Sequence, residues 1–239
     1  MCIFNKDITV KMTKIMAAFT APGRQVLMYQ NDIKTDDEEA IMMLPFPTKG
    51  RIELIDSTPF SKMLNVISER VIEKEHEGSR GLSPKDLTDF KVVGQYRYKT
   101  CTGSELLEMD GIPSWLPSIV EKYNGWNWLL CYMAPNSDIS AQPLMVEFDS
   151  TIDSLYYPMM DIHGDSPIQE LVRRDHILIT GDPELTGWRA AAGSEFEKFP
   201  YPELKFAGFS IQKMFLNGDA YATLTEAPND PRFWNFKMK

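Results

Sequence analysis

The stretch that decides the fold is Ala21-Pro22-Gly23-Arg24-Gln25-Val26-Leu27-Met28-Tyr29-Gln30. Its first three residues have the chemistry of a tight turn, because proline presets one backbone angle and glycine accepts unusual ones. The residues from Gln25 to Gln30 form the clearest strand in the chain. Apolar, β-prone segments flank this stretch at residues 12–19 and 39–46, and Pro45 and Pro47 are expected to end the pairing of the latter. The first fifty residues therefore predict β-hairpins.

Further along the chain, the hydrophobic spacing predicts two helices among several strands. Residues 73–86 are charged and contain glycine and proline, so we expect an exposed loop there. The predicted class is α+β, a mostly antiparallel β-sheet with a few packing helices. Residues 1–182 are expected to form one β-rich domain, and residues 183–239 an extension that wraps the same domain. The helices are expected at 61–73 and 114–123, and the further strands at 90–98, 126–133, 142–148, 155–162 and 176–180.

Composition excludes several classes of function. The chain has 239 residues and a formal net charge of −9, which disfavours the phosphate contacts that nucleic-acid binding needs. No apolar run approaches the ~20 residues that span a bilayer, and no secretory signal pattern begins the chain. We therefore predict a cytoplasmic protein without a membrane partner. The three cysteines form no CxxC pair, so neither a structural zinc ribbon nor a disulfide framework is expected.

Cys2 is the residue whose position alone suggests chemistry. Removal of Met1 would make Cys2 the amino terminus, with an α-amine beside its thiol. Because such an amine has a pKa of about 7.7–8, it could act as a general base for the thiol. The alternative is that Cys2 is a small buried hydrophobic residue. Both interpretations remain open from the sequence.

Two histidines stand beside carboxylates. His163 lies in the segment Asp161-Ile162-His163-Gly164-Asp165, and His176 follows Asp175. An aspartate that orients a histidine is half of a Cys-His-Asp arrangement, with Cys2 as the nucleophile. The same atoms could hold a divalent metal, or the aspartates could merely close a turn. We expect no metal and no cofactor, because no phosphate, dinucleotide or zinc-protease motif is present.

Three groups of segments resemble a group of uncharacterised bacterial proteins that includes the domain-of-unknown-function family twenty-three thirty. In that group a cysteine stands at the mature start, and a proline-containing strand end follows the early hairpins. Some members carry a histidine–glycine turn and a later Asp-His pair. The resemblance supports a fold more than a function, because the group has no assigned activity. The segments are Met1-Cys2 with Thr13-Lys14-Ile15 and residues 25–29; Met43-Leu44-Pro45-Phe46-Pro47; and residues 128–130, 143–148, 157–158, 161–165 and 175–176.

Two functions remain after these exclusions. The first is a non-catalytic module that binds a protein partner or self-associates, for which the aromatic segment 231–236 could be a docking element. The second is a thiol-dependent amide hydrolase or acyl transferase. In that case Cys2 would be the nucleophile, its α-amine, His163 or His176 the base, and Asp175 the orienting residue.

Overall fold

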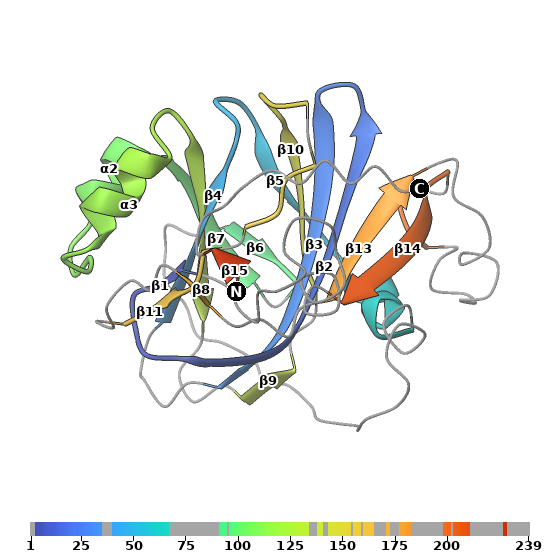
Figure 1. Ribbon diagram of the computed structural model, residues 1–239, viewed down its shortest axis with the longest axis horizontal. Coiled ribbons are helices and arrows are strands. Elements are labelled where there is room, and N and C mark those ends of the chain that lie inside the picture. The colour runs from blue at the N-terminus through green and yellow to red at the C-terminus, as the bar shows by residue number, and fades with distance from the viewer. Residues whose placement is uncertain are drawn as a thin grey trace.

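Two β-sheets pack against each other in the computed structural model of the chain and share one apolar core (Figure 1). The N-terminal hairpin, β2 (Thr9–Ala21) with β3 (Arg24–Lys34), forms the centre of one sheet and turns where the sequence predicted. The structure describes residues 3–34, 40–66, 91–94, 96–133, 138–140, 143–153, 155–158, 160–164, 171–172, 177–182, 198–201, 203–210 and 227–228.

The first sheet, sheet A, has the strand order β11-β1-β4-β8-β7-β6. Its neighbouring strands are antiparallel except that β1 runs parallel to β11, with Phe4 opposite His163. The strands are β1 (Ile3–Phe4), β4 (Ala40–Phe46), β6 (Lys91–Val93), β7 (Tyr96–Thr102), β8 (Asn127–Met133) and β11 (Ile162–His163).

The second sheet, sheet B, has the order β14-β13-β2-β3-β10-β5, and β9 also pairs with β3. Here β13 runs parallel to β2, so the sheets are mixed and the expectation of a mostly antiparallel sheet holds only in part. A separate pair joins β12 (Leu171–Val172) to β15 (Ala227–Pro228). The remaining strands are β5 (Ile52–Ile55), β9 (Asp138–Ser140), β10 (Leu144–Asp149), β13 (Ile177–Asp182) and β14 (Lys205–Ser210).

Each sheet is apolar on both faces. The inner faces meet in the shared core, whereas the outer face of sheet A lies under α2 (Gly103–Leu107) and α3 (Leu116–Lys122). The outer face of sheet B lies under η1 (Thr58–Phe60), the helical turn at residues 63–66 and the side chains of Phe199, Tyr201 and Leu204. Figure 1 shows α2 and α3 on the side of sheet A that faces away from sheet B. Because alternate residues of a strand point to opposite faces, double burial explains the nearly unbroken apolar run of β4.

Several expected elements differ from the structure. The strand expected at 90–98 is a hairpin of β6 and β7, because Gly94 adopts a positive φ of 57° and turns the chain. Pro45 does not end pairing, since it lies opposite Trp128 within β4. The missing N–H of Pro45 costs no ladder bond to β1, whose pairing with β4 covers only Met42 and Met43. The spacing did not predict β5 or α2.

The strand expected at 155–162 is also wrong, because among the described residues of this span only the last, Ile162, belongs to a strand, β11. The other elements that the structure describes are near their expected positions. The loop at 73–86, and the part of the expected helix after residue 66, lie outside the described residues. Although β14 pairs with β13 across the proposed boundary after residue 182, the division of the chain there stays a prediction.

Tyr156 joins the two sheets through its backbone and its side chain. Its backbone N–H donates to Oε1 of Gln25 on β3 at 3.2 Å, and its hydroxyl donates to the carbonyl of Pro45 on β4 at 2.5 Å. The side chain is fully buried, and this burial raises the pKa of Tyr156 well above its ordinary value. The hydroxyl therefore stays a neutral donor. Edge-to-face contacts surround the ring, with Phe46, Phe148 and Trp126 as partners.

We predict that Tyr156→Phe lowers the free energy of unfolding by about 1–3 kcal/mol, because the variant leaves a buried carbonyl without its donor. Urea denaturation measures the change. Ser118→Ala is the control, since it removes an exposed hydroxyl that also donates to a carbonyl, that of Trp115. We expect less than about 0.5 kcal/mol for this variant. Equal effects of the two substitutions would contradict the bridging role of Tyr156.

Candidate functional site

Of the four residues that the sequence singled out, the structure describes His163. Cys2, Asp175 and His176 lie outside the described residues, so their proposed roles stay predictions. The start of the described chain does lie beside His163, because β1 begins with Ile3 and pairs with β11. No local pattern in the sequence predicts this pairing, which joins residues about 160 positions apart.

His163 lies against a carboxylate and an aromatic ring. Its Nε2 is 3.1 Å from Oδ1 of Asp161, and its ring packs edge-on against Phe4 with centroids 5.5 Å apart. The contact with Asp161 is close but lacks the alignment of a hydrogen bond. It is an ion pair when the imidazole is protonated. The side chain is 23% exposed, so solvent reaches part of it. The carboxylate beside His163 is thus Asp161, whereas the aspartate named as the orienting residue from the sequence was Asp175.

The turn after His163 is held from two sides. Gly164 has a φ of 55°, and a side chain there would place its Cβ 2.3 Å from Oδ1 and 2.8 Å from the backbone nitrogen of Asp7. Trp115 donates from Nε1 to the carbonyl of Gly164 at 2.7 Å. These contacts link the His163 turn to the loop after β1 and to the start of α3. Neither Asp7 nor Trp115 was expected in this region, because both are remote from it in the chain.

We predict that Gly164→Ala destabilises the protein more than Gly111→Ala does. Both glycines have a positive φ, but a Cβ at Gly111 would meet nothing within 4 Å. The control should therefore lose only the ~1 kcal/mol of backbone strain, whereas the close contact with Asp7 adds to that cost at Gly164. Thermal denaturation of the two variants measures the difference. Equal destabilisation would show that Asp7 moves away without cost.

The two described cysteines lack the environment of a nucleophile. Cys131 is fully buried in the shared core, and Cys101 is buried on the outer face of sheet A. Burial and the nearby Glu105 raise the pKa of the Cys101 thiol to about 11, although Lys99 opposes the shift. Since the thiolate is the reactive form, a thiol that stays protonated at neutral pH is a poor nucleophile.

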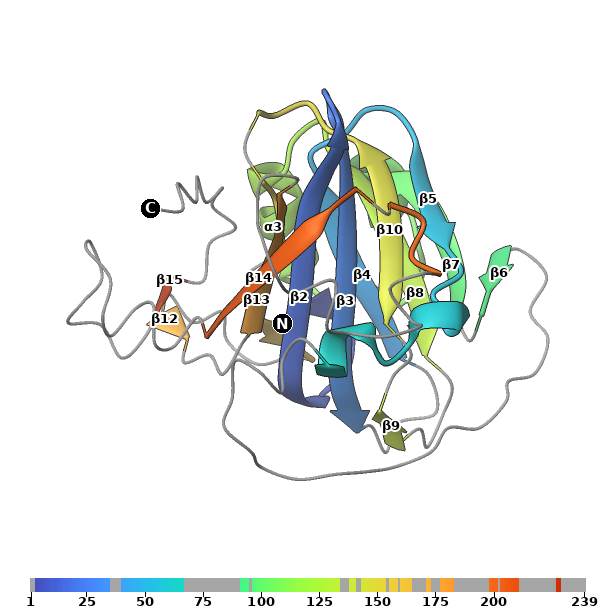
Figure 2. The same cartoon turned by 90° about the vertical axis from the view of Figure 1, so that its right-hand side faces the viewer.

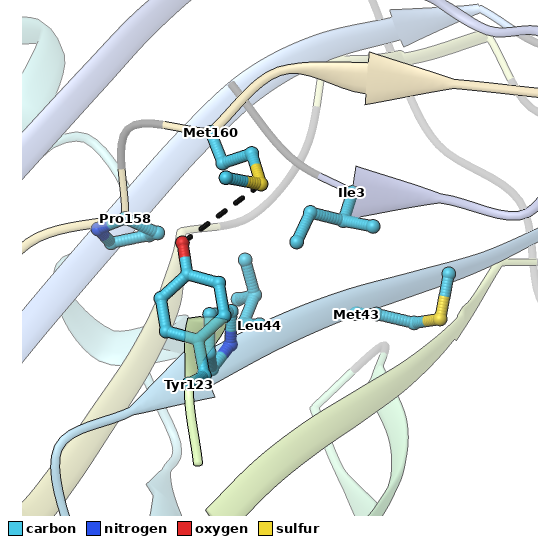
Figure 3. A pocket seen from close by; sticks show the side chains of 7 residues that line it. Ile3, Met43, Leu44, Tyr123, Pro158 and Met160 are labelled. Carbon is cyan, nitrogen blue, oxygen red and sulfur yellow. Dashed lines mark hydrogen bonds between the residues drawn. The ribbon is translucent and has the colours of Figure 1, made fainter. Parts of the chain in front are cut away.

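Two small pockets lie among the described residues. One, which has no room for a water molecule, lies where Pro158 and Met160 approach β1, β4 and the end of α3 (Figure 3). Tyr123 points its hydroxyl toward the sulfur of Met160 across this pocket, at 4.0 Å. A second pocket, of about 280 Å³, lies under the turn between α2 and α3. His163 lines neither of them. The aromatic residues Trp128, Tyr156 and Tyr157 belong to the cores instead.

Within the part of the chain that the structure describes, no group of three or more histidine, cysteine, aspartate or glutamate side chains is placed to hold a metal ion. Among the same residues, no helix has the length and apolar character needed to cross a membrane.

The comparisons with known proteins identify a similar fold. No family model matches the sequence, and no curated protein matches it significantly. Among solved structures, the two-sheet architecture is similar to that of a viral protein. The crystal structure of baculovirus P35 matches with a TM-score of 0.50 and 15% identity, over 79% of this chain and 70% of that chain.

Two other P35 structures match less well. A mutated P35 after caspase cleavage gives a TM-score of 0.44 at 15% identity, over 80% of this chain and 72% of that chain. The caspase-8/P35 complex gives a TM-score of 0.43 at 14% identity, over 74% and 65%. At these identities the likeness concerns the fold alone, and the first match carries the comparison.

Proposed function

We propose that this chain is a non-catalytic protein-binding protein and that its partner is a protease of the caspase type. The observation that carries the proposal is the fold match to baculovirus P35, which extends over 79% of the chain. P35 itself has been crystallised in a complex with caspase-8 and after caspase cleavage. Because a fold can host unrelated functions, the partner is an inference by analogy that needs its own test.

The architecture supports a binding role. The central strands of both sheets are buried on both faces, and several hydrogen bonds join the loops at one end of the two sheets. Thr151 donates to the carbonyl of Pro47 from both its N–H and its hydroxyl, and Ser150 donates to the carbonyl of Gly23. Such a rigid framework can present a segment to a partner with little loss of conformational freedom on binding.

We predict that the purified chain forms a complex with active caspase-8 that survives size-exclusion chromatography. The eluted species should contain both proteins, and peptide hydrolysis by the caspase should fall as the chain is added. Intact-mass analysis of the complex would also show whether the chain has been cut. A chain that neither co-elutes with caspase-8 nor changes its activity would overturn the proposed partner.

A thiol-dependent hydrolase or acyl transferase is the second candidate, and one observation favours it. The backbone of β1 pairs with β11, so the strand that follows Cys2 in the sequence lies beside His163 and Asp161. An imidazole with a neighbouring carboxylate is a suitable base for a thiol. The candidate requires that Met1 is removed if the α-amine is to serve as the base.

We predict, for this second candidate, that iodoacetamide at pH 7.5 labels Cys2 much faster than Cys101 or Cys131. Burial and the raised pKa of Cys101 make the latter two slow, so they act as internal controls. Peptide mass spectrometry after timed labelling measures all three rates. Equal rates in the folded protein would remove Cys2 as a nucleophile.

A further inference from the structure

Val92 is an apolar side chain that the fold leaves in solvent. It is 65% exposed, and it is the large hydrophobic residue that stands out as exposed among the described residues. Val92 lies opposite Arg97, and Arg97 lies opposite Tyr132. These three residues form one row across the outer face of sheet A, with the Arg97 guanidinium 5.3 Å from the centre of the Tyr132 ring. Arg97 on β7 and Tyr132 on β8 therefore pack against each other, whereas Val92 on β6 is exposed to solvent.

The strand that carries Val92 is at the end of its sheet. Within the described part of the chain, β6 (Lys91–Val93) pairs with β7 and with no strand on its other side. Figure 2 shows β6 at the margin of the molecule. Native proteins protect such edges, because the outward backbone N–H and C=O groups can pair with another chain. Extended segments of partners bind in this way to several protein modules.

The neighbours of Val92 define what kind of strand would fit. Lys91 and Val93 lie opposite Tyr98 and Tyr96, on the inner-face rows of the sheet. Lys91 is exposed, and Val93 packs partly against the shared core. In a paired strand, directly opposite side chains interact, and opposite charges stabilise the pair. A fitting segment therefore has an apolar residue opposite Val92 and, on its other face, an acidic residue opposite Lys91.

We propose that β6 accepts an extended segment of the protein partner as an additional strand of sheet A. The segment alternates an apolar side chain, which covers Val92, with a carboxylate side chain, which pairs with Lys91. This inference rests on the proposed function and names the surface that serves it. Val92 supplies the apolar contact, and the lysine gives the strand a local positive charge in a chain whose net charge is −9.

Substitutions at the edge test the proposal with matched controls. Val92→Lys should weaken binding to caspase-8 about tenfold or more, because it places a charge where the partner's apolar residue would pack. Val92→Ile keeps the apolar contact and should bind within about twofold of the wild-type chain. Lys91→Glu should also weaken binding, whereas Lys122→Glu on the exposed side of α3 should not. Calorimetric titration gives the affinities, and circular dichroism confirms that each variant is folded.

The outcomes separate this inference from the proposed function. If the wild-type chain binds caspase-8 and the Val92→Lys variant binds it with the same affinity, only the edge proposal is overturned. No binding by the wild-type chain would overturn both. A second copy of the chain is the other occupant to consider. The wild-type chain could dimerise, and Val92→Lys could abolish the dimer without changing the affinity for caspase-8. This result would assign the edge to self-association and overturn the proposal that a partner strand binds there.

Hydrogen exchange provides a second measurement that needs no substitution. If the partner adds a strand, the outward amides within residues 91–93 should exchange more slowly in the wild-type complex than in the free chain. Unchanged exchange in these residues, with protection elsewhere, would place the interface on another surface and overturn the proposal.

Discussion

The fold depends on the way in which one irregular segment holds two sheets at a fixed separation. Tyr156 belongs to no strand, yet its N–H bonds to a side chain of sheet B and its hydroxyl bonds to the backbone of sheet A. Both contacts lie in the shared core, where a polar group without a partner is costly. The ring also fills the space among Phe46, Phe148 and Trp126. One residue therefore combines the packing and the polar alignment of the sheets.

This arrangement explains why the chain after β10 is irregular. A regular strand would use the N–H of Tyr156 in a ladder, but here that group donates to Gln25. After Pro158 the chain passes Met160, which packs with the outer-face cluster of sheet A, and then enters β11 beside β1. The position of His163 therefore follows from the packing of the core. The segment that contains Tyr156 and joins the two sheets leads into β11, which places His163 beside β1.

The sequence predicted the hairpin of β2 and β3, strands near β4, β8, β10 and β13, and a helix near α3. These elements have strong local signals, because turn residues and apolar spacing act over a few positions. The prediction failed where a long-range contact determines the local conformation, as at Tyr156, whose hydrogen-bond partners are 131 and 111 residues away. It also failed at Gly94, where a lone glycine inside an alternating pattern turns the chain instead of continuing the strand. The alternation of apolar and polar residues was a weak guide because the central strands of each sheet are buried on both faces.

For the candidate site, residue types were easier to predict than their neighbours. The sequence selected His163 and the carboxylates beside it, but the contacts with Phe4, Asp7 and Trp115 come from packing. The exposed edge of β6 likewise emerges only from the strand order, since Val92 resembles any other apolar strand residue in the sequence. Local sequence patterns can thus identify candidate site residues, whereas the surface available to a partner depends on which strand lies at the edge of the sheet.

Native-state hydrogen exchange at the backbone amide of Tyr156 tests the central claim most directly. If this residue holds the sheets together, its amide should exchange only when the whole protein unfolds, with a protection free energy equal to the free energy of global unfolding. Exchange through a local opening of much lower free energy, while the amides of β3 and β8 remain protected, would contradict the account.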